Sequence, residues 1–80
     1  IRLAAFLERD DAARGRAKIA AALSDFFTET DLAIREADAP GVGRVHRVVA
    51  GPLPNRAAAN ALCAAVRDRG ADCLPGAPDQ

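Results

Sequence analysis

The spacing of apolar residues changes from alternation to a helical period within the first third of the chain. Residues 1–7, IRLAAFL, place every second side chain on one side of an extended backbone, which predicts a strand. Asp10 or Asp11 can accept hydrogen bonds from the free amides of a first helical turn. Apolar residues then follow at roughly helical spacing, so we expect a helix that continues to about Phe27.

The middle of the chain predicts two more strands. Residues 32–35, LAIR, alternate from one side of an extended chain to the other, and residues 39–43, APGVG, carry turn chemistry. Residues 44–50, RVHRVVA, are rich in β-branched side chains. This strand stops at Gly51 and Pro52, which cannot continue a regular strand.

The clearest helix lies in the last third. Asn55 is a good helix cap, and apolar residues follow from Ala59 at positions i, i+3, i+4 and i+7 before Gly70 closes the helix. Residues 71–74 leave room for a short last strand, and residues 76–80 form a tail. We therefore expect one domain over residues 1–75.

The predicted element order is βαββαβ, and the two halves resemble each other at a shift of 47 positions. Phe6, Ala12 and Ile19 then align with Leu53, Ala59 and Val66, and Arg9 aligns with Arg56. Two repeats of strand plus helix pack most simply as a four-stranded antiparallel sheet with both helices on one face. This is an α+β fold of the ferredoxin-like or RNP-like type, and it leaves the other sheet face open.

Strand alternation predicts which side chains occupy this open face. They are Arg2, Ala4, Ala33, Arg35, Arg47 and Val49. The three arginines have two interpretations, either ordinary solvated charges or a platform of planar donors for sugar hydroxyls or carboxylates. The alternation pattern alone does not separate them.

Composition and charge weigh against nucleic acid and against membrane insertion. Ala fills twenty positions, Phe three, and Trp, Tyr and Met none, while eleven basic residues cancel eleven acidic ones. A single-stranded RNA platform needs positive charge and exposed aromatic rings, so we expect no nucleic-acid partner. No stretch approaches the roughly eighteen apolar residues of a membrane helix, and no signal sequence opens the chain. A strand at the very start suggests a piece of a longer protein.

Catalytic and metal chemistry find little support either. Ser24 is the only serine and lies far in sequence from His46, and neither an acidic pair nor a glycine-rich phosphate loop appears. Two cysteines and one histidine are too few for a structural zinc site. We expect no enzyme activity, no cofactor and no metal. Cys63 and Cys73 fit either a disulfide or two buried free thiols.

A family resemblance adds to this interpretation. Residues 45–53, VHRVVAGPL, resemble the second half of the SPOR (sporulation-related repeat) domain, where the pattern is an aromatic, Arg, Val, a variable pair, Gly-Pro and an apolar residue. One cysteine in the second helix and one in the last strand are also similar to a bacterial subset of the family. The helix positions that match are Arg56, Ala59, Leu62, Val66 and Gly70.

The first half departs from the family pattern at several positions. Arg2 replaces a Gln and Ala4 replaces a Gly in the first strand, whereas Phe6 matches. Gly15 stands where the family prefers an apolar helix residue, and His46 where it prefers Tyr. A Gln side chain offers sugar hydroxyls both a donor and an acceptor, whereas Arg offers donors only. The preferred glycan can therefore differ.

The resemblance implies a non-catalytic module that binds peptidoglycan glycan strands stripped of their stem peptides. Such a module targets an envelope or cell-division protein to the septum, which implies a periplasmic location. The glycan-binding positions that it implies are Arg2, Ala4, Arg47 and Val49, to which alternation adds Arg35. In that compartment Cys63 and Cys73 are expected to form a disulfide.

One alternative from a different class remains beside the SPOR interpretation. It is a ferredoxin-like module that uses its open sheet face for protein–protein interaction, such as dimerisation or docking of a division protein. For the peptidoglycan-binding module we expect a monomer, so a stable dimer that buries Arg2, Arg35 and Arg47 would favour the alternative.

Overall fold

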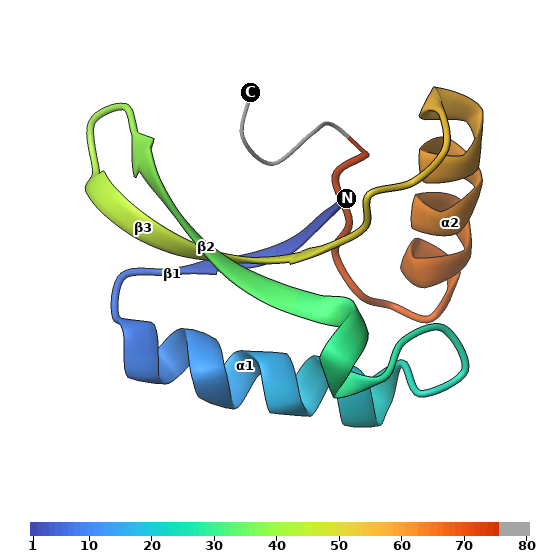
Figure 1. The fold of residues 1–80 in the computed structure, drawn as a ribbon, viewed down its shortest axis with the longest axis horizontal. Coiled ribbons are helices and arrows are strands. Elements are labelled where there is room, and N and C mark those ends of the chain that lie inside the picture. The colour runs from blue at the N-terminus through green and yellow to red at the C-terminus, as the bar shows by residue number, and fades with distance from the viewer. Residues whose placement is uncertain (76–80) are drawn as a thin grey trace.

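A computed structural model describes residues 1–75. Every predicted helix is present, and the first three strands are confirmed (Figure 1). The first helix ends at Ala22 rather than near Phe27, and residues 23–26 form a turn. The tail predicted at residues 76–80 lies outside the described residues. The elements are β1 (Arg2–Phe6), α1 (Arg9–Ala22), the short 3₁₀ helix η1 (Glu29–Asp31), β2 (Leu32–Ala39), β3 (Gly43–Ala50) and α2 (Arg56–Asp68).

The sheet is antiparallel, and its strand order is β1-β3-β2. The hairpin of β2 and β3 pairs without interruption from Leu32 opposite Ala50 to Ala39 opposite Gly43. Strand β3 lies in the centre of the sheet and carries the β-branched residues that predicted a strand over residues 44–50.

The prediction of a fourth strand is wrong for the described residues. Residues 71–74 make only an isolated antiparallel bridge, in which the backbones of Arg2 and Leu74 exchange two hydrogen bonds of 2.9 and 2.8 Å. Pro75 follows at once and has no N–H with which to extend the ladder. Cys73 is also bonded covalently to α2, which holds the segment near the helix.

The two helices cover the sheet differently. Helix α1 runs along one face and contacts all three strands, whereas α2 stands upright beside the sheet, at the end where the N-terminus lies (Figure 1). The buried side of α2 still joins the same core as α1. Helix α1 therefore covers one face of the sheet, as expected. Helix α2, which was expected on the same face, instead closes the end of the core. That core contains Leu3, Leu23, Phe27, Leu32, Val48, Ala59, Cys63 and Val66.

Gly15 has a packing role within α1. The ring of Phe6 from β1 lies so close to this position that a Cβ atom added to Gly15 would overlap it. A glycine weakens a helix interior by about 1 kcal/mol relative to alanine. Here the missing side chain makes room for the ring, which packs against the core.

The two helices begin differently. Helix α1 starts at Arg9, and the side chain of its cap residue, Glu8, accepts no backbone hydrogen bond. The predicted cap at Asp10 or Asp11 is therefore wrong, because both lie inside the first turn, where a carboxylate instead favours the positive end of the helix dipole. The prediction for α2 is confirmed: the Asn55 side chain accepts a 2.8 Å hydrogen bond from the backbone N–H of Ala58.

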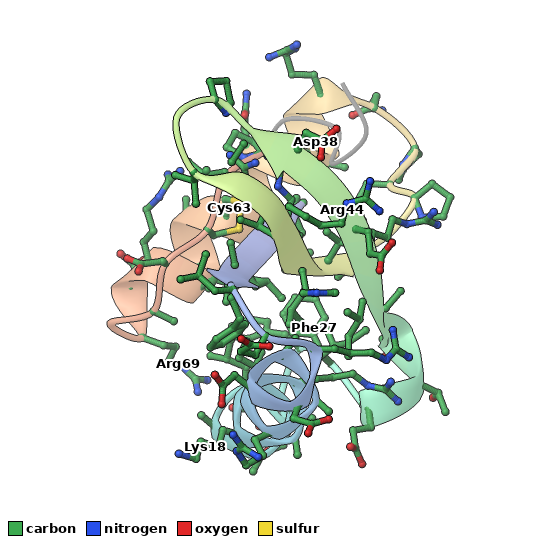
Figure 2. The ribbon with its side chains drawn as sticks, turned by 90° about the vertical axis from the view of Figure 1, so that its left-hand side faces the viewer. Lys18, Phe27, Asp38, Arg44, Cys63 and Arg69 are labelled. Carbon is green, nitrogen blue, oxygen red and sulfur yellow. A yellow bond between two sulfur atoms is a disulfide. The ribbon has the colours of Figure 1, made fainter. Side chains whose placement is uncertain are left out.

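A disulfide joins Cys63 of α2 to Cys73, as the resemblance implies (Figure 2). Both residues are buried, and their Cα atoms are 5.1 Å apart. The bond closes a loop across Gly70, whose φ of +85° lies in the region that favours glycine. The C-terminal segment is thus held against α2 by one covalent bond and against β1 by the bridge.

Candidate functional site

Strand β1 contains an irregularity that changes which of its residues lie on the open face of the sheet. Arg2 lies opposite Val49, but the next pair is Ala4 with Val48, so Leu3 is an extra residue and forms a β-bulge. Ala5, rather than Ala4, then lies opposite Arg47.

The bulge corrects the expected placement of Ala4. An extra residue reverses the alternation that follows it, so Ala4 shares its row with the fully buried Val48 and packs against the core. Leu3 is only 5% exposed and also belongs to the core. Ala5 takes the place on the open face that alternation assigned to Ala4.

The register brings the three predicted arginines to one side of the sheet. Arg47 lies directly opposite Arg35 on β2, and Arg2 is its diagonal neighbour on β1, close enough for long side chains to reach one another. Val49 lies between Arg2 and Ala33 but is only 4% exposed. It therefore belongs to the floor of this face more than to its accessible surface.

A shallow concavity of about 680 Å³ lies on this side of the molecule. Of the predicted site residues its lining includes Arg2 and Arg47, together with Ala4, which borders both the core and the concavity. Arg35 and Val49 are not part of the lining. Strands β1 and β3, the hairpin and the segment that ends at Leu74 surround it. Its apolar lining includes Ala5, Ala39, Val42, Val45 and Leu74, and its charged groups among residues 1–75 are Arg2, Arg47, Arg67 and Asp72.

Sequence reasoning missed Arg67, which reaches the concavity from α2. Its Nη2 donates a 2.7 Å hydrogen bond to the carbonyl oxygen of Cys73. A signal for this placement was present, because Arg67 follows Cys63 by four residues and so lies on the same side of the helix. Pairing Cys63 with Cys73 would have brought Arg67 beside the last segment.

Several other arginines are engaged by carboxylates. Arg44 pairs with Glu36 at 3.0 Å and with Asp38 at 3.6 Å on the hairpin (Figure 2). Arg69 pairs with Asp25, and its guanidinium also stacks 5.1 Å from the centre of the Phe26 ring. Within residues 1–75, by contrast, neither Arg2 nor Arg67 forms an ion pair. Their positive charges are therefore not neutralised by a neighbouring carboxylate in the described structure.

Comparison with family models now decides the family. The model of the SPOR domain matches residues 1–75 of this chain. The chain belongs to the SPOR domain family. Comparison with curated proteins and with solved structures finds no match. SPOR domains bind peptidoglycan and are associated with the bacterial envelope, and the family is one of binding domains rather than enzymes.

The polar residues considered for catalysis lie elsewhere in this SPOR domain. His46 is paired with Phe6 and Glu36, in the rows that face away from the arginines. The part of the chain that the structure describes contains no group of three His, Cys, Asp or Glu residues able to hold a metal ion. None of the helices within residues 1–75 is long and apolar enough to cross a membrane. The arginine-lined concavity is thus the candidate binding site of this SPOR domain.

Proposed function

We propose that this SPOR domain binds glycan strands that have lost their stem peptides, laid across the concavity on the open sheet face. Binding of this kind would bring the protein that carries the domain to the division septum, in the periplasm. The observation that supports the proposal is the concavity itself, where Arg2 and Arg47 stand over an apolar floor. The disulfide between two buried cysteines fits an oxidising compartment.

The shape of the concavity suits a polymer of sugars. A shallow, open site accepts the middle of a long strand without enclosing it, and guanidinium groups supply several hydrogen bonds to its polar edges. Stem peptides that project from successive sugars would hold an intact strand away from the floor. Stripped strands can instead lie flat against Val45 and Ala5.

Purified sacculi provide the direct test. We expect the bound fraction of the domain to rise after amidase treatment of the sacculi, and Arg47→Ala to weaken binding about tenfold or more, because a hydrogen bond to a charged group contributes roughly 1.5–3 kcal/mol. Arg44→Ala is the matched control, since Arg44 lies on the same strand but in a row that faces the other side. Its binding should equal that of the wild type.

Two outcomes would contradict the proposal. Failure to bind either untreated or treated sacculi would show that this SPOR domain does not bind the glycan strands proposed as its ligand. A stable dimer in light scattering, disrupted by Arg2→Glu and Arg35→Glu, would instead favour use of the open face for protein contact. We expect a monomer.

A further inference from the structure

The described residues that line the concavity are more basic than the chain as a whole. The full chain has a net charge of zero, yet among the described residues the lining includes three guanidinium groups and one carboxylate, that of Asp72, and neither Arg2 nor Arg67 forms an ion pair within residues 1–75. A local surplus of positive charge on a neutral protein favours an anionic ligand group over a neutral one. We therefore expect the ligand of the concavity to carry a negatively charged group.

Arg2 and Arg67 come from different elements and both form hydrogen bonds with the segment that contains Cys73 and Leu74. The backbone of Arg2 exchanges hydrogen bonds with Leu74, and the guanidinium of Arg67 binds the carbonyl oxygen of the adjacent Cys73. Cys73 is itself fixed to α2 by the disulfide with Cys63. Two arginines from different elements therefore flank one short, covalently anchored segment, and the hydrogen bond to Cys73 orients the Arg67 guanidinium before a ligand binds.

The donor chemistry of this pair suits a carboxylate. A guanidinium has five N–H donors and no acceptor, and only one donor of Arg67 is engaged by Cys73. A sugar hydroxyl both donates and accepts hydrogen bonds, and a guanidinium can satisfy only its acceptor side. A carboxylate needs donors alone, and arginine binds it through two parallel hydrogen bonds.

Stripped and intact glycan strands differ in whether they carry a free carboxylate. In intact peptidoglycan the lactyl carboxyl group of each muramyl sugar is an amide, because it carries the stem peptide, and it is uncharged. Hydrolysis of that amide adds water across the C–N bond, releases the peptide amine and leaves a carboxylate on the sugar. A stripped strand therefore gains one negative charge at each muramyl residue.

We propose that this domain recognises that newly exposed lactyl carboxylate, which Arg2 and Arg67 bind at the edge of the concavity. The inference rests on the proposed function, and it adds selection by charge to exclusion by shape. Recognition then depends on the product of peptide removal and not merely on the absence of the peptide. It also assigns a ligand-binding role to Arg67, a residue of α2 outside the sheet.

The test compares two soluble forms of amidase-stripped glycan. In one the carboxylates are intact, and in the other they have been converted to alcohols by carbodiimide activation and borohydride reduction. We expect the dissociation constant from calorimetry to be at least tenfold lower for the carboxylate form. Raising the salt concentration from 50 to 300 mM should weaken the carboxylate form and leave the alcohol form nearly unchanged.

Variants assign the effect to residues. Arg2→Gln and Arg67→Gln should each remove most of the difference between the two glycans, and Arg44→Gln should preserve it. Because loss of the bond to Cys73 can loosen the fold, Arg67→Lys, which keeps the charge, and thermal melting of each variant accompany the set. Arg67→Lys should retain part of the preference.

The outcomes separate this inference from the proposed function. Equal affinity for both glycans would overturn carboxylate recognition while leaving glycan binding intact. Failure to bind either form would overturn both. A preference that survives in both Arg2→Gln and Arg67→Gln would also overturn the assignment, because the charge would then be recognised elsewhere.

Discussion

The helices of the two strand–helix repeats begin at equivalent positions, yet they are stabilised in different ways. Arg9 and Arg56, 47 positions apart, are the first residues of the two helices. Helix α1 lies along the sheet and contacts every strand, and it begins without a side-chain cap. Helix α2 stands at the end of the sheet and has both a capping Asn55 and a disulfide. Helix α2 covers less of the sheet and is supported instead by its N-terminal cap and by the covalent bond at Cys63.

The largest test of this contrast is removal of the disulfide. We expect Cys63→Ala with Cys73→Ala to lower the free energy of unfolding by roughly 2–3 kcal/mol, because closing so short a loop restricts the unfolded chain by about that amount. Urea unfolding of the wild type with and without reductant provides the same comparison without mutation. Equal midpoints in the two conditions would contradict covalent support of α2.

Gly15 provides the corresponding test in the first repeat. Gly15→Ala should destabilise the domain by about 1–2 kcal/mol, although alanine favours a helix interior, because the new methyl group would overlap the Phe6 ring. In a Phe6→Leu background the same substitution should become neutral or stabilising by up to about 1 kcal/mol. Thermal unfolding of the four proteins measures this coupling, and additive effects would show that the contact does not matter.

The helix caps offer a matched pair of substitutions. Asn55→Ala should lower the free energy of unfolding by about 1 kcal/mol, because the N–H of Ala58 loses its partner. Glu8→Ala, at the equivalent position of α1, should change it by less than about 0.5 kcal/mol, since that side chain caps nothing. Similar losses in both variants would show that α1 depends on its first turn as much as α2 does.

The smallest effect concerns pH and the connection between α1 and β2. Hydrogen bonds from the backbone and the hydroxyl of Thr28 lower the pKa of Asp31 below its usual value. This lowered pKa means that the stabilising contribution is present above the usual aspartate pKa of about 4 and is lost as the pH falls through the lowered value. Asp31→Asn should therefore flatten the acid limb of the stability curve slightly. An unchanged acid limb would contradict this role.

Much of the fold could be predicted because its signals are local. The β-branched run of β3, the capping Asn55 and the apolar spacing of α2 each lie within a few neighbouring residues. The last strand depended instead on how far a ladder extends beside β1, which Pro75 and the disulfide limit to a single bridge. Local propensity does not contain that information.

The candidate site shows the same division. Alternation placed Arg35 and Arg47 on the same side of the hairpin, because their register has no interruption. It misplaced Ala4, since a bulge depends on the pairing of two strands distant in sequence. Arg67 was missed because its place in the site comes from the packing of α2 against the last segment, which no strand pattern encodes.

The extra residue in β1 has a consequence for how relatives of this chain evolve and are aligned. Arg2 and Phe6, four positions apart, would share a side in a regular strand, but here one borders the concavity and the other meets α1. One codon inserted or lost within this stretch thus exchanges concavity-facing and core-facing positions without changing any neighbouring amino acid. An alignment of relatives that admits no gap at Leu3 would compare residues of the concavity in one protein with core residues in another.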